Sequence, residues 1–437
     1  MAHTLNGTLP PGYDGNDVAV TARERWTLGV ISIGHFFSHY FALVLPPLFP
    51  FLKAEFGVSY LELGLAMTAY GLLGGVMQSP VGFLVDRVGP RNVLLVGLGL
   101  NACAVILMGL VNAYWVLLAL AVLAGMGNSV FHPADYAIIN NSIREKKLGR
   151  AFSLHTFSGF LGGACAPVSI LVLAQWTSWR TALIVAGIGG LFALAAMTWR
   201  RDLLNDAHPS NASTGASAGA SAAASSGASS GADNAAPDGP SPQQSGIRLL
   251  LSPAVLLFLL FFILYGMSSG GLIAFTVTGL VGLHGISLEQ ANTALSAHLF
   301  GVVAGILFAG IITDRFPRHL ITATAALLLV AIATALAVVV PGSSFVLITL
   351  MALSGVGLGA VLPARDLMLR ALTPPGQFGK VIGFVFVGYS IGVSIAPILF
   401  GWFLDKNQPA YVFYGAAVFA LLALMATIAA QRMTPQQ

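Results

Sequence analysis

The sequence predicts an all-α integral membrane protein with twelve transmembrane helices in two pseudo-symmetric six-helix bundles. Three observations predict this class. First, the 20 basic and 16 acidic residues make up only 8% of the 437 residues, and 56% are hydrophobic, whereas soluble proteins carry about 25% charged residues. Second, apolar stretches long enough to cross a bilayer recur along the chain. Third, the two halves of the chain repeat one another.

The apolar stretches fall into two sets of six. Those of the first set lie at 27–51, 61–85, 93–111, 114–139, 150–174 and 179–199. Those of the second set lie at 253–281, 288–312, 319–340, 345–369, 379–403 and 409–431. The predicted domains are an N-terminal tail (1–25), an N-terminal bundle (26–200), a linker (201–248), a C-terminal bundle (249–431) and a C-terminal tail (432–437). Ala, Gly, Ser and Pro dominate the linker, so we expect a disordered cytoplasmic tether.

The basic residues between the spans predict the orientation. If the N-terminus is cytoplasmic, 16 Lys and Arg residues fall in inside segments and 3 in outside segments. Because cytoplasmic loops carry the excess of positive charge, both termini are expected to be cytoplasmic. The expected location is the cell membrane, with multiple passes, and in a bacterium the inner membrane.

Several classes of function are excluded by composition and motifs. A net charge of +4 spread over so few charged residues leaves no basic groove for nucleic acid. No phosphate-binding loop for ATP and no nucleophile with a base at catalytic spacing is found, so neither an ATP-driven pump nor an enzyme is expected. Cys103 and Cys165 lie 62 positions apart in apolar stretches and form neither a disulfide framework nor a metal knuckle. No cofactor is expected.

The repeat between the halves is visible at fixed offsets. At an offset of 230 the equivalent pairs are Gly125 and Gly355, Pro133 and Pro363, Gly162 and Gly392, and Pro167 and Pro397. At an offset of 228, Gly82 and Asp86 recur as Gly310 and Asp314. Repeats with an even number of spans keep the same topology, so the halves should be related by an axis along the membrane normal.

Two loops carry a family resemblance. The loop after the second span reads Gly82-Phe-Leu-Val-Asp86-Arg87-Val-Gly89-Pro90-Arg91, which resembles the Gly-x-x-x-Asp-Arg-x-Gly-x-Arg loop of the major facilitator superfamily. A weaker copy with Gly310, Asp314 and Arg315 follows the eighth span, where that family also repeats it. We expect these residues to gate the cytoplasmic side through charge-assisted contacts that break when the halves rock.

Two helices extend the resemblance. The fifth span contains Gly159, Gly162, Gly163 and Pro167, a helix-packing motif similar to the Gly-rich stretch of antiporters in that family, although Ala166 stands where they have Gly. The fourth span, with Phe131, His132 and Pro133, resembles that of fosmidomycin-resistance-type exporters, with the acidic residue one place later, at Asp135. The resemblance implies the major facilitator fold and alternating access around a midplane cavity. Because the two halves are self-sufficient, a monomer is expected.

Three charged residues lie well inside spans: Asp135, Arg365 and Asp366. Charges in the membrane interior are costly unless paired, so they are candidates for function. Asp135 and Arg365 are repeat equivalents, which leaves three hypotheses. They form a salt bridge between the halves; or Arg365 binds an anionic solute while Asp135 carries a proton; or each is paired within its own half, with Asp366 taking part.

Histidines within the spans are further candidates for carrying protons. Asn128, His132 and Asp135 follow i, i+4, i+7 spacing and are expected on one helix face. His35 and His39 lie one turn apart on the first span, and His155 and His298 add two further imidazoles. We therefore predict proton coupling by Asp135, His132, His35 and His39, because imidazole titrates near neutrality. A metal site is not expected, since the first span has no acidic residue beside its two histidines.

Polar residues within the spans are candidates for binding the solute. The predicted set is Arg365, Asp366, Asn128, Tyr136, Tyr265, Tyr389, His298 and Gln78. The predicted function is proton-coupled export of a small organic, anionic compound or drug, with the proton gradient as energy source. Two alternatives remain: a proton-coupled uptake symporter for a carboxylate or phosphorylated solute, and a non-transporting membrane receptor or scaffold. The expected partners are a small-molecule solute and the lipid bilayer.

Overall fold

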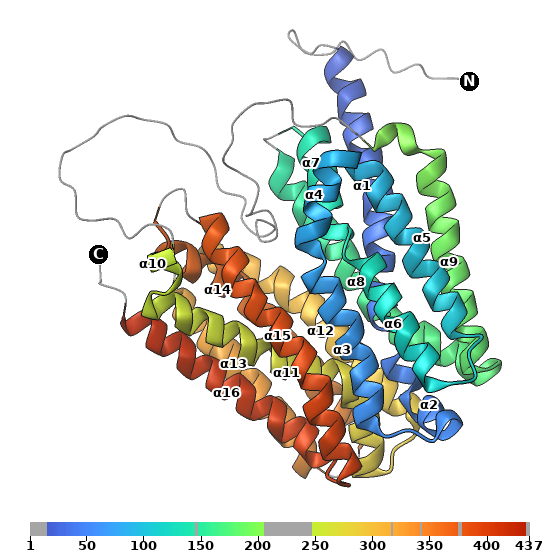
Figure 1. Cartoon of the computed structure of the whole chain (residues 1–437). Coiled ribbons are helices and arrows are strands. Elements are labelled where there is room, and N and C mark those ends of the chain that lie inside the picture. The colour runs from blue at the N-terminus through green and yellow to red at the C-terminus, as the bar shows by residue number, and fades with distance from the viewer. Residues whose placement is uncertain are drawn as a thin grey trace, which may run out of the picture.

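The structure is a computed structural model, and it describes residues 15–144, 147–204, 247–315, 318–340, 343–374 and 378–433. Every regular element within these ranges is helical (Figure 1). Most of the predicted linker and the outer part of each predicted tail lie outside the described residues.

The first half runs from α1 to η3. Its elements are α1 (Gly15–Ala42), η1 (Pro46–Leu48), α2 (Phe49–Phe56), α3 (Tyr60–Val76), α4 (Gln78–Val88), α5 (Pro90–Met108), α6 (Tyr114–Asn128), α7 (Phe131–Ser142), α8 (Leu148–Trp176), α9 (Trp179–Trp199) and η3 (Arg201–Leu203). The helix α1 begins inside the predicted tail 1–25, because a hydropathy window finds apolar spans and not their polar helical extensions.

The second half runs from α10 to α16. Its elements are α10 (Ile247–Leu250), α11 (Pro253–His284), α12 (Leu288–Arg315), α13 (His319–Val339), α14 (Ser344–Leu372), α15 (Phe378–Asp405) and α16 (Ala410–Arg432). In the described chain, 11 helical stretches are long and apolar enough to cross a membrane, or 12 when the bent pair α3 and α4 is taken as one span. The prediction of twelve spans in two sets of six is therefore confirmed.

Proline interrupts the helices of the first half. The axes of α3 and α4 differ by 46° at Met77. Pro80 lies four residues after Val76 and has no N–H to bond the carbonyl there, which accounts for the bend. The fourth span is likewise split between α6 and α7, and Pro133 lies four residues after Ser129. The equivalent Pro363 sits inside an unbroken α14, so the repeat is not exact in backbone.

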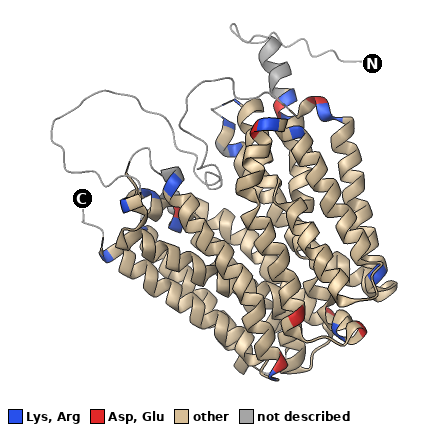
Figure 2. Ribbon diagram, viewed as in Figure 1, with Lys and Arg blue, Asp and Glu red and all other residues tan. Residues whose placement is uncertain are grey.

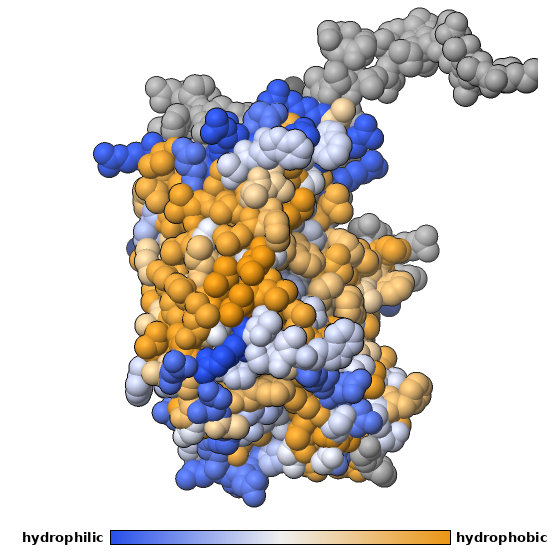
Figure 3. Space-filling model, turned by 90° about the vertical axis from the view of Figure 1, so that its right-hand side faces the viewer, coloured by the Kyte–Doolittle hydropathy of each residue, from blue (hydrophilic) through white to orange (hydrophobic). Residues whose placement is uncertain are grey.

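Polar and apolar residues are distributed as a bilayer requires. Charged residues gather at the two ends of the helices, and Lys and Arg are abundant at the end where α1 begins and α16 ends (Figures 1 and 2). We call this end the terminal face and the other end the opposite face. An apolar band covers the middle of the molecule (Figure 3). Large apolar side chains are also exposed elsewhere on the helices, such as Phe83, Phe192 and Phe345 at 76%, 72% and 79%, as expected for contact with lipid.

The two halves are held together near the opposite face. The Asp405 carboxylate at the end of α15 accepts hydrogen bonds from the backbone N–H groups of Tyr60 and Leu61, at 2.8 and 2.9 Å, where α3 begins. Further along the same pair, Thr68 donates to the carbonyl of Ser394 at 2.6 Å. The halves diverge toward the terminal face in Figure 1. The contact between α3 and α15 thus forms a seam, which we call the opposite-face seam.

Candidate functional site

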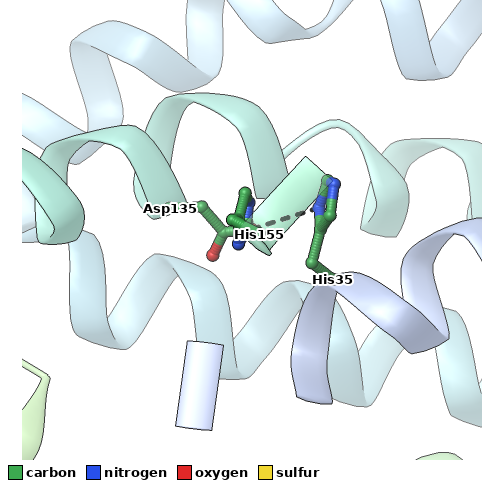
Figure 4. A group of neighbouring side chains, drawn as sticks. All are labelled: His35, Asp135 and His155. Atoms are coloured by element: carbon green, nitrogen blue, oxygen red, sulfur yellow. Dashed lines mark ion pairs between the residues drawn. The ribbon is translucent and has the colours of Figure 1, made fainter. Parts of the chain in front are cut away.

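Asp135 lies at the centre of a buried cluster built from three helices. It stands on α7, and its Oδ2 is 3.4 Å from Nδ1 of His35 on α1 and 3.3 Å from Nε2 of His155 on α8 (Figure 4). All three side chains are buried, with Asp135 entirely enclosed. We call these three residues and the adjoining His39 and His132 the imidazole–carboxylate cluster.

Two further imidazoles extend the cluster from the same helices. The ring of His39 lies 4.7 Å from that of His35, and the ring of His132 lies 5.6 Å from it. The rings of His35 and His155 are stacked, with centroids 3.9 Å apart and planes inclined by 24°. Unlike the buried three, His39 and His132 are partly exposed. The structure therefore brings together all four residues that were predicted for proton coupling.

His155 is the member that the sequence-based prediction of coupling residues missed. No local pattern connects it to Asp135, because it stands on a different helix and its partner is 20 positions away. Its position in an apolar span was the only available signal.

The polar atoms of the cluster are short of hydrogen-bond partners. Among the described residues, neither oxygen of Asp135 nor Nδ1 of His35 has a hydrogen bond of good geometry, and the same holds for both ring nitrogens of His155. A buried polar group without a partner is costly. An arrangement of this kind is suited to taking up a proton, which a carboxylate and an imidazole at this distance can share.

The same donor atoms also have a spacing that a cation could bridge. One ligand atom from each of His35, Asp135 and His155 lies within 4.8 Å of the other two. The acidic residue that the first span lacks is thus supplied by α7. The expectation of no metal remains a prediction.

Arg365 organises a second polar site in the other half. Its side chain on α14 is 7% exposed, and its Nε donates to Oδ1 of Asp366 at 3.1 Å. Its Cζ lies 4.4 Å from the ring centre of Phe262 and 5.2 Å from that of Phe386. Aromatic faces stabilise a cation that has left water. We call this surrounding the aromatic cage of Arg365.

Two predicted tyrosines join this second site. The ring of Tyr265 lies 5.5 Å from Cζ of Arg365, and its hydroxyl donates to the carbonyl of Leu358 at 3.0 Å. The Tyr389 ring lies 6.0 Å from that of Tyr265. The two terminal nitrogens of the Arg365 guanidinium make no hydrogen bond to the described residues. They are the donors that an oxyanion would engage in bidentate fashion.

The ion pairs in the structure distinguish between the hypotheses for the charged residues inside the spans. Arg365 pairs with Asp366, and Asp135 pairs with histidines of its own half. No ion pair joins Asp135 to Arg365 among the described residues. This conformation has the pairing within each half and not the salt bridge between the halves.

Other predicted solute-binding residues lie apart from both centres. Asn128 is the last residue of α6, and its Oδ1 accepts a hydrogen bond from Nδ2 of Asn101 at 3.4 Å. His298 is fully buried on α12, with Nδ1 3.3 Å from the carbonyl of Met351. Gln78 is the first residue of α4, at the bend. Tyr136 alone contacts the cluster, with its ring 5.8 Å from that of His132.

The predicted gating loop is mostly helical. Gly82, Asp86 and Arg87 belong to α4, and only Gly89, with φ of 94°, separates α4 from α5. The Nε of Arg91 donates to the carbonyl of Leu204 at 2.9 Å. In the repeat, Gly310 lies within α12 and Asp314 and Arg315 end it, but the side chains of these last two are outside the described part.

Glycines of the predicted packing motif lie where helices approach closely. Gly159, Gly162 and Gly163 of α8 face α1. Gly392 of α15 lies against the backbone of α11, and Pro167 and Pro397 are inside α8 and α15.

Twelve apolar spans in two repeated halves, with buried ionisable residues in each half, define a secondary membrane transporter. The chain belongs to the Major Facilitator Superfamily, whose sequence model matches residues 31–284 and 257–436. Both the resemblance and the fold predicted from sequence are confirmed. The family also confirms that the chain is not an enzyme.

Comparison with curated proteins finds a resistance protein and two probable transporters among the relatives. The fosmidomycin resistance protein of Escherichia coli is 23% identical over 401 residues, which cover 91% of each chain. A probable L-galactonate transporter of Escherichia coli is 26% identical over 157 residues, 36% of this chain and 34% of the relative. A probable sulfoacetate transporter of Cupriavidus necator is 28% identical over 161 residues, 37% of each.

A solved structure has the same fold. A bacterial homologue of the human lysosomal transporter Spinster, in an inward-facing and occupied conformation, superposes with a TM-score of 0.72 at 15% identity. The match covers 94% of this chain and 97% of that one.

Proposed function

We propose that this transporter exports a small organic anion in exchange for protons, with both chain termini in the cytoplasm. The observation that carries the anion assignment is the buried Arg365, whose terminal nitrogens have no hydrogen-bond partner among the described residues. A guanidinium presents a planar fork that matches carboxylate, sulfonate and phosphonate oxygens. The names of two relatives support an anionic solute, since L-galactonate and sulfoacetate are organic anions.

The imidazole–carboxylate cluster supports the proton as the coupling ion. Removal of a carboxylate from water favours its neutral form, and nearby imidazoles can accept or return the proton. In the proposed cycle Asp135 is protonated from outside and releases its proton toward the cytoplasm. The anion is bound at Arg365 when the site faces inward, and it displaces Asp366 from the guanidinium. Neither step needs ATP.

The excess of basic residues at the terminal face supports a cytoplasmic location for that face. The opposite-face seam would then close the pathway on the outside, as in an inward-facing state. Both sites lie within one chain, which supports a monomer as the working unit.

An uptake symporter is the second candidate. The relatives named as transporters of L-galactonate and sulfoacetate, and Ala166 in place of the antiporter glycine, favour it. Export by exchange and uptake by symport predict opposite directions of solute movement under the same proton gradient.

Inside-out membrane vesicles with an acidified lumen separate the two candidates. Fosmidomycin, L-galactonate and sulfoacetate, each radiolabelled, serve as probes. An exporter that exchanges solute for protons accumulates its probe in the lumen, because protons leave as the solute enters. A symporter releases preloaded probe instead, and that result would contradict export. Vesicles from cells without the protein provide the control.

A further inference from the structure

Gly159 stands beside the imidazole–carboxylate cluster. It lies on α8, one turn after His155, and faces α1. A methyl group added at Gly159 would lie 2.6 Å from Cδ2 and Nε2 of His35 and 2.8 Å from Cδ2 of His39. Carbon atoms without a bond between them do not approach so closely. The space that a side chain at 159 would fill is therefore occupied by two imidazole rings.

The other two glycines of this stretch, Gly162 and Gly163, have different neighbours. A methyl group at Gly162 would collide with the backbone of Phe36, so that glycine is required for the two helices to approach. At Gly163 the nearest atoms are Cδ1 of Leu43 at 3.3 Å and Cβ of His39 at 3.9 Å. A small shift of a leucine end accommodates alanine there, and no imidazole ring atom is among the closest neighbours.

We propose that Gly159 is a positioning residue of the transport cycle: by lacking a side chain, it holds the His35 ring against Asp135 and His155. This inference rests on the proposed role of the cluster in proton exchange. It assigns to one glycine of the packing motif a function that the motif's other glycines do not share.

The surroundings of His35 make its position sensitive. Its ring stacks on His155 at 3.9 Å, and its Nδ1 lies 3.4 Å from the Asp135 carboxylate. The remaining titratable neighbours of His35 are His39 on its own helix and His132 on α7, and Tyr136 lies against His132 and His155. A methyl group at 159 moves the ring ends and not the backbone, so Gly159→Ala should fold while changing the contact of His35 with Asp135.

Infrared difference spectroscopy of the purified full-length protein tests the proposal without a solute. The C=O band of a protonated carboxyl group is followed against pH, and Asp135→Asn identifies the band by removing it. In Gly159→Ala the midpoint of that band shifts by about one pH unit, which is a change in proton affinity on the order of tenfold. A shift of this size is expected when His35 is moved out of contact with the Asp135 carboxylate. The matched control Gly163→Ala leaves the midpoint at its wild-type value.

A double-mutant cycle shows whether the effect passes through His35. With His35→Ala already present, only the His39 ring remains for the added methyl group to displace, so adding Gly159→Ala causes a much smaller further shift. Equal midpoints in Gly159→Ala and Gly163→Ala would overturn the proposal, and so would a shift of undiminished size in the His35→Ala background. If Asp135→Asn leaves the band and its pH dependence unchanged, the proposed proton site itself fails, which is a separate outcome.

Discussion

The side chain of Asp135 pairs with two imidazoles, at 3.3 and 3.4 Å, and with no Arg or Lys of the described chain. An ionised carboxylate in such a buried place is stable only when a neighbour carries a positive charge. The proton therefore decides the charge of the whole group, and each imidazole in contact with Asp135 should influence exchange.

His155 provides a test at this scale. We expect His155→Gln to reduce pH-driven transport on the order of tenfold, because it removes one of the two imidazoles that contact the Asp135 carboxylate and can exchange a proton with it. Exchange of labelled for unlabelled solute, which moves no net proton, should be retained. His298→Gln is the matched control, because His298 is equally buried but contacts a backbone carbonyl. Equal loss of net transport and exchange in His155→Gln would contradict the assignment.

Arg365 provides the second test. Lysine keeps the charge but loses the planar fork and the stacking on aromatic faces. We expect Arg365→Lys to raise the KM for the transported probe at least about tenfold, the value of one charged hydrogen bond. The control Arg370→Gln removes an exposed arginine of the same helix and should leave the KM unchanged. An unaltered KM in Arg365→Lys would remove Arg365 from the solute site.

The functional residues that could be identified from the sequence are charged residues that lie within apolar spans. Asp135, Arg365 and Asp366 stand out because charges inside apolar spans are rare. Their partners do not stand out, since His35, Asp135 and His155 come from three helices. Which imidazole meets the carboxylate depends on how those helices pack, and no local pattern records it.

At the scale of elements, helix breaks decide which residues share a face. The prediction put Asn128 with His132 and Asp135 because it assumed one straight helix. Two turn residues, Ser129 and Val130, separate α6 from α7, and the i, i+4, i+7 rule assumes a helix without such an interruption. Pro133 gave a signal of this break, and Pro80 gave one for the bend between α3 and α4. The helix ends were otherwise close to those expected, except in the first span, predicted at 27–51, where α1 runs from Gly15 to Ala42 and α2 follows separately.

The opposite-face seam yields a prediction about elements. Asp405 caps the N-terminus of α3 from the other half, and Nζ of Lys53 lies 3.7 Å from its Oδ1. Helix N-termini attract negative charge, so Asp405→Asn should weaken the seam. We expect an approximately tenfold faster reaction of a cysteine at the seam, since hydrogen bonds to charged groups contribute roughly 1.5 to 3 kcal/mol.

The measurement uses Ser394→Cys, a buried position of α15, in a chain whose Cys103 and Cys165 are replaced by serine. A membrane-impermeant maleimide is added to intact cells, and the labelling rate is compared with and without Asp405→Asn. Lys406→Gln changes the exposed neighbouring residue and is the control. Identical labelling rates would show that Asp405 does not hold the seam closed.

For the whole molecule, the repeat explains why one fold carries two different polar sites. Asp135 and Arg365 occupy equivalent positions of the two halves, yet one half surrounds its charge with imidazoles and the other with aromatic rings. Alternating access moves the halves relative to each other. In the proposed cycle, sites on both halves are then exposed to the same side in turn, and a proton and an anion are exchanged across the membrane.

The number of spans and their division into halves could be predicted because both follow from local hydrophobicity and from the repeat. The conformation, in which the molecule is closed at one face, could not be predicted from the sequence. Closure at one face depends on contacts such as that of Asp405 with Tyr60, which join residues 345 positions apart. Such contacts reflect a balance between states of similar energy, and a single sequence carries no local sign of that balance.

The central claim is that solute and proton move in opposite directions through Asp135. Its most direct test is the pH of the lumen of inside-out vesicles, read by an enclosed dye, when the transported probe is added outside. We predict that the lumen becomes more alkaline with the wild-type protein as protons leave in exchange. With Asp135→Asn, labelled probe should still enter while the lumen pH stays constant. Acidification of the lumen, or an unchanged alkaline response in Asp135→Asn, would contradict the account.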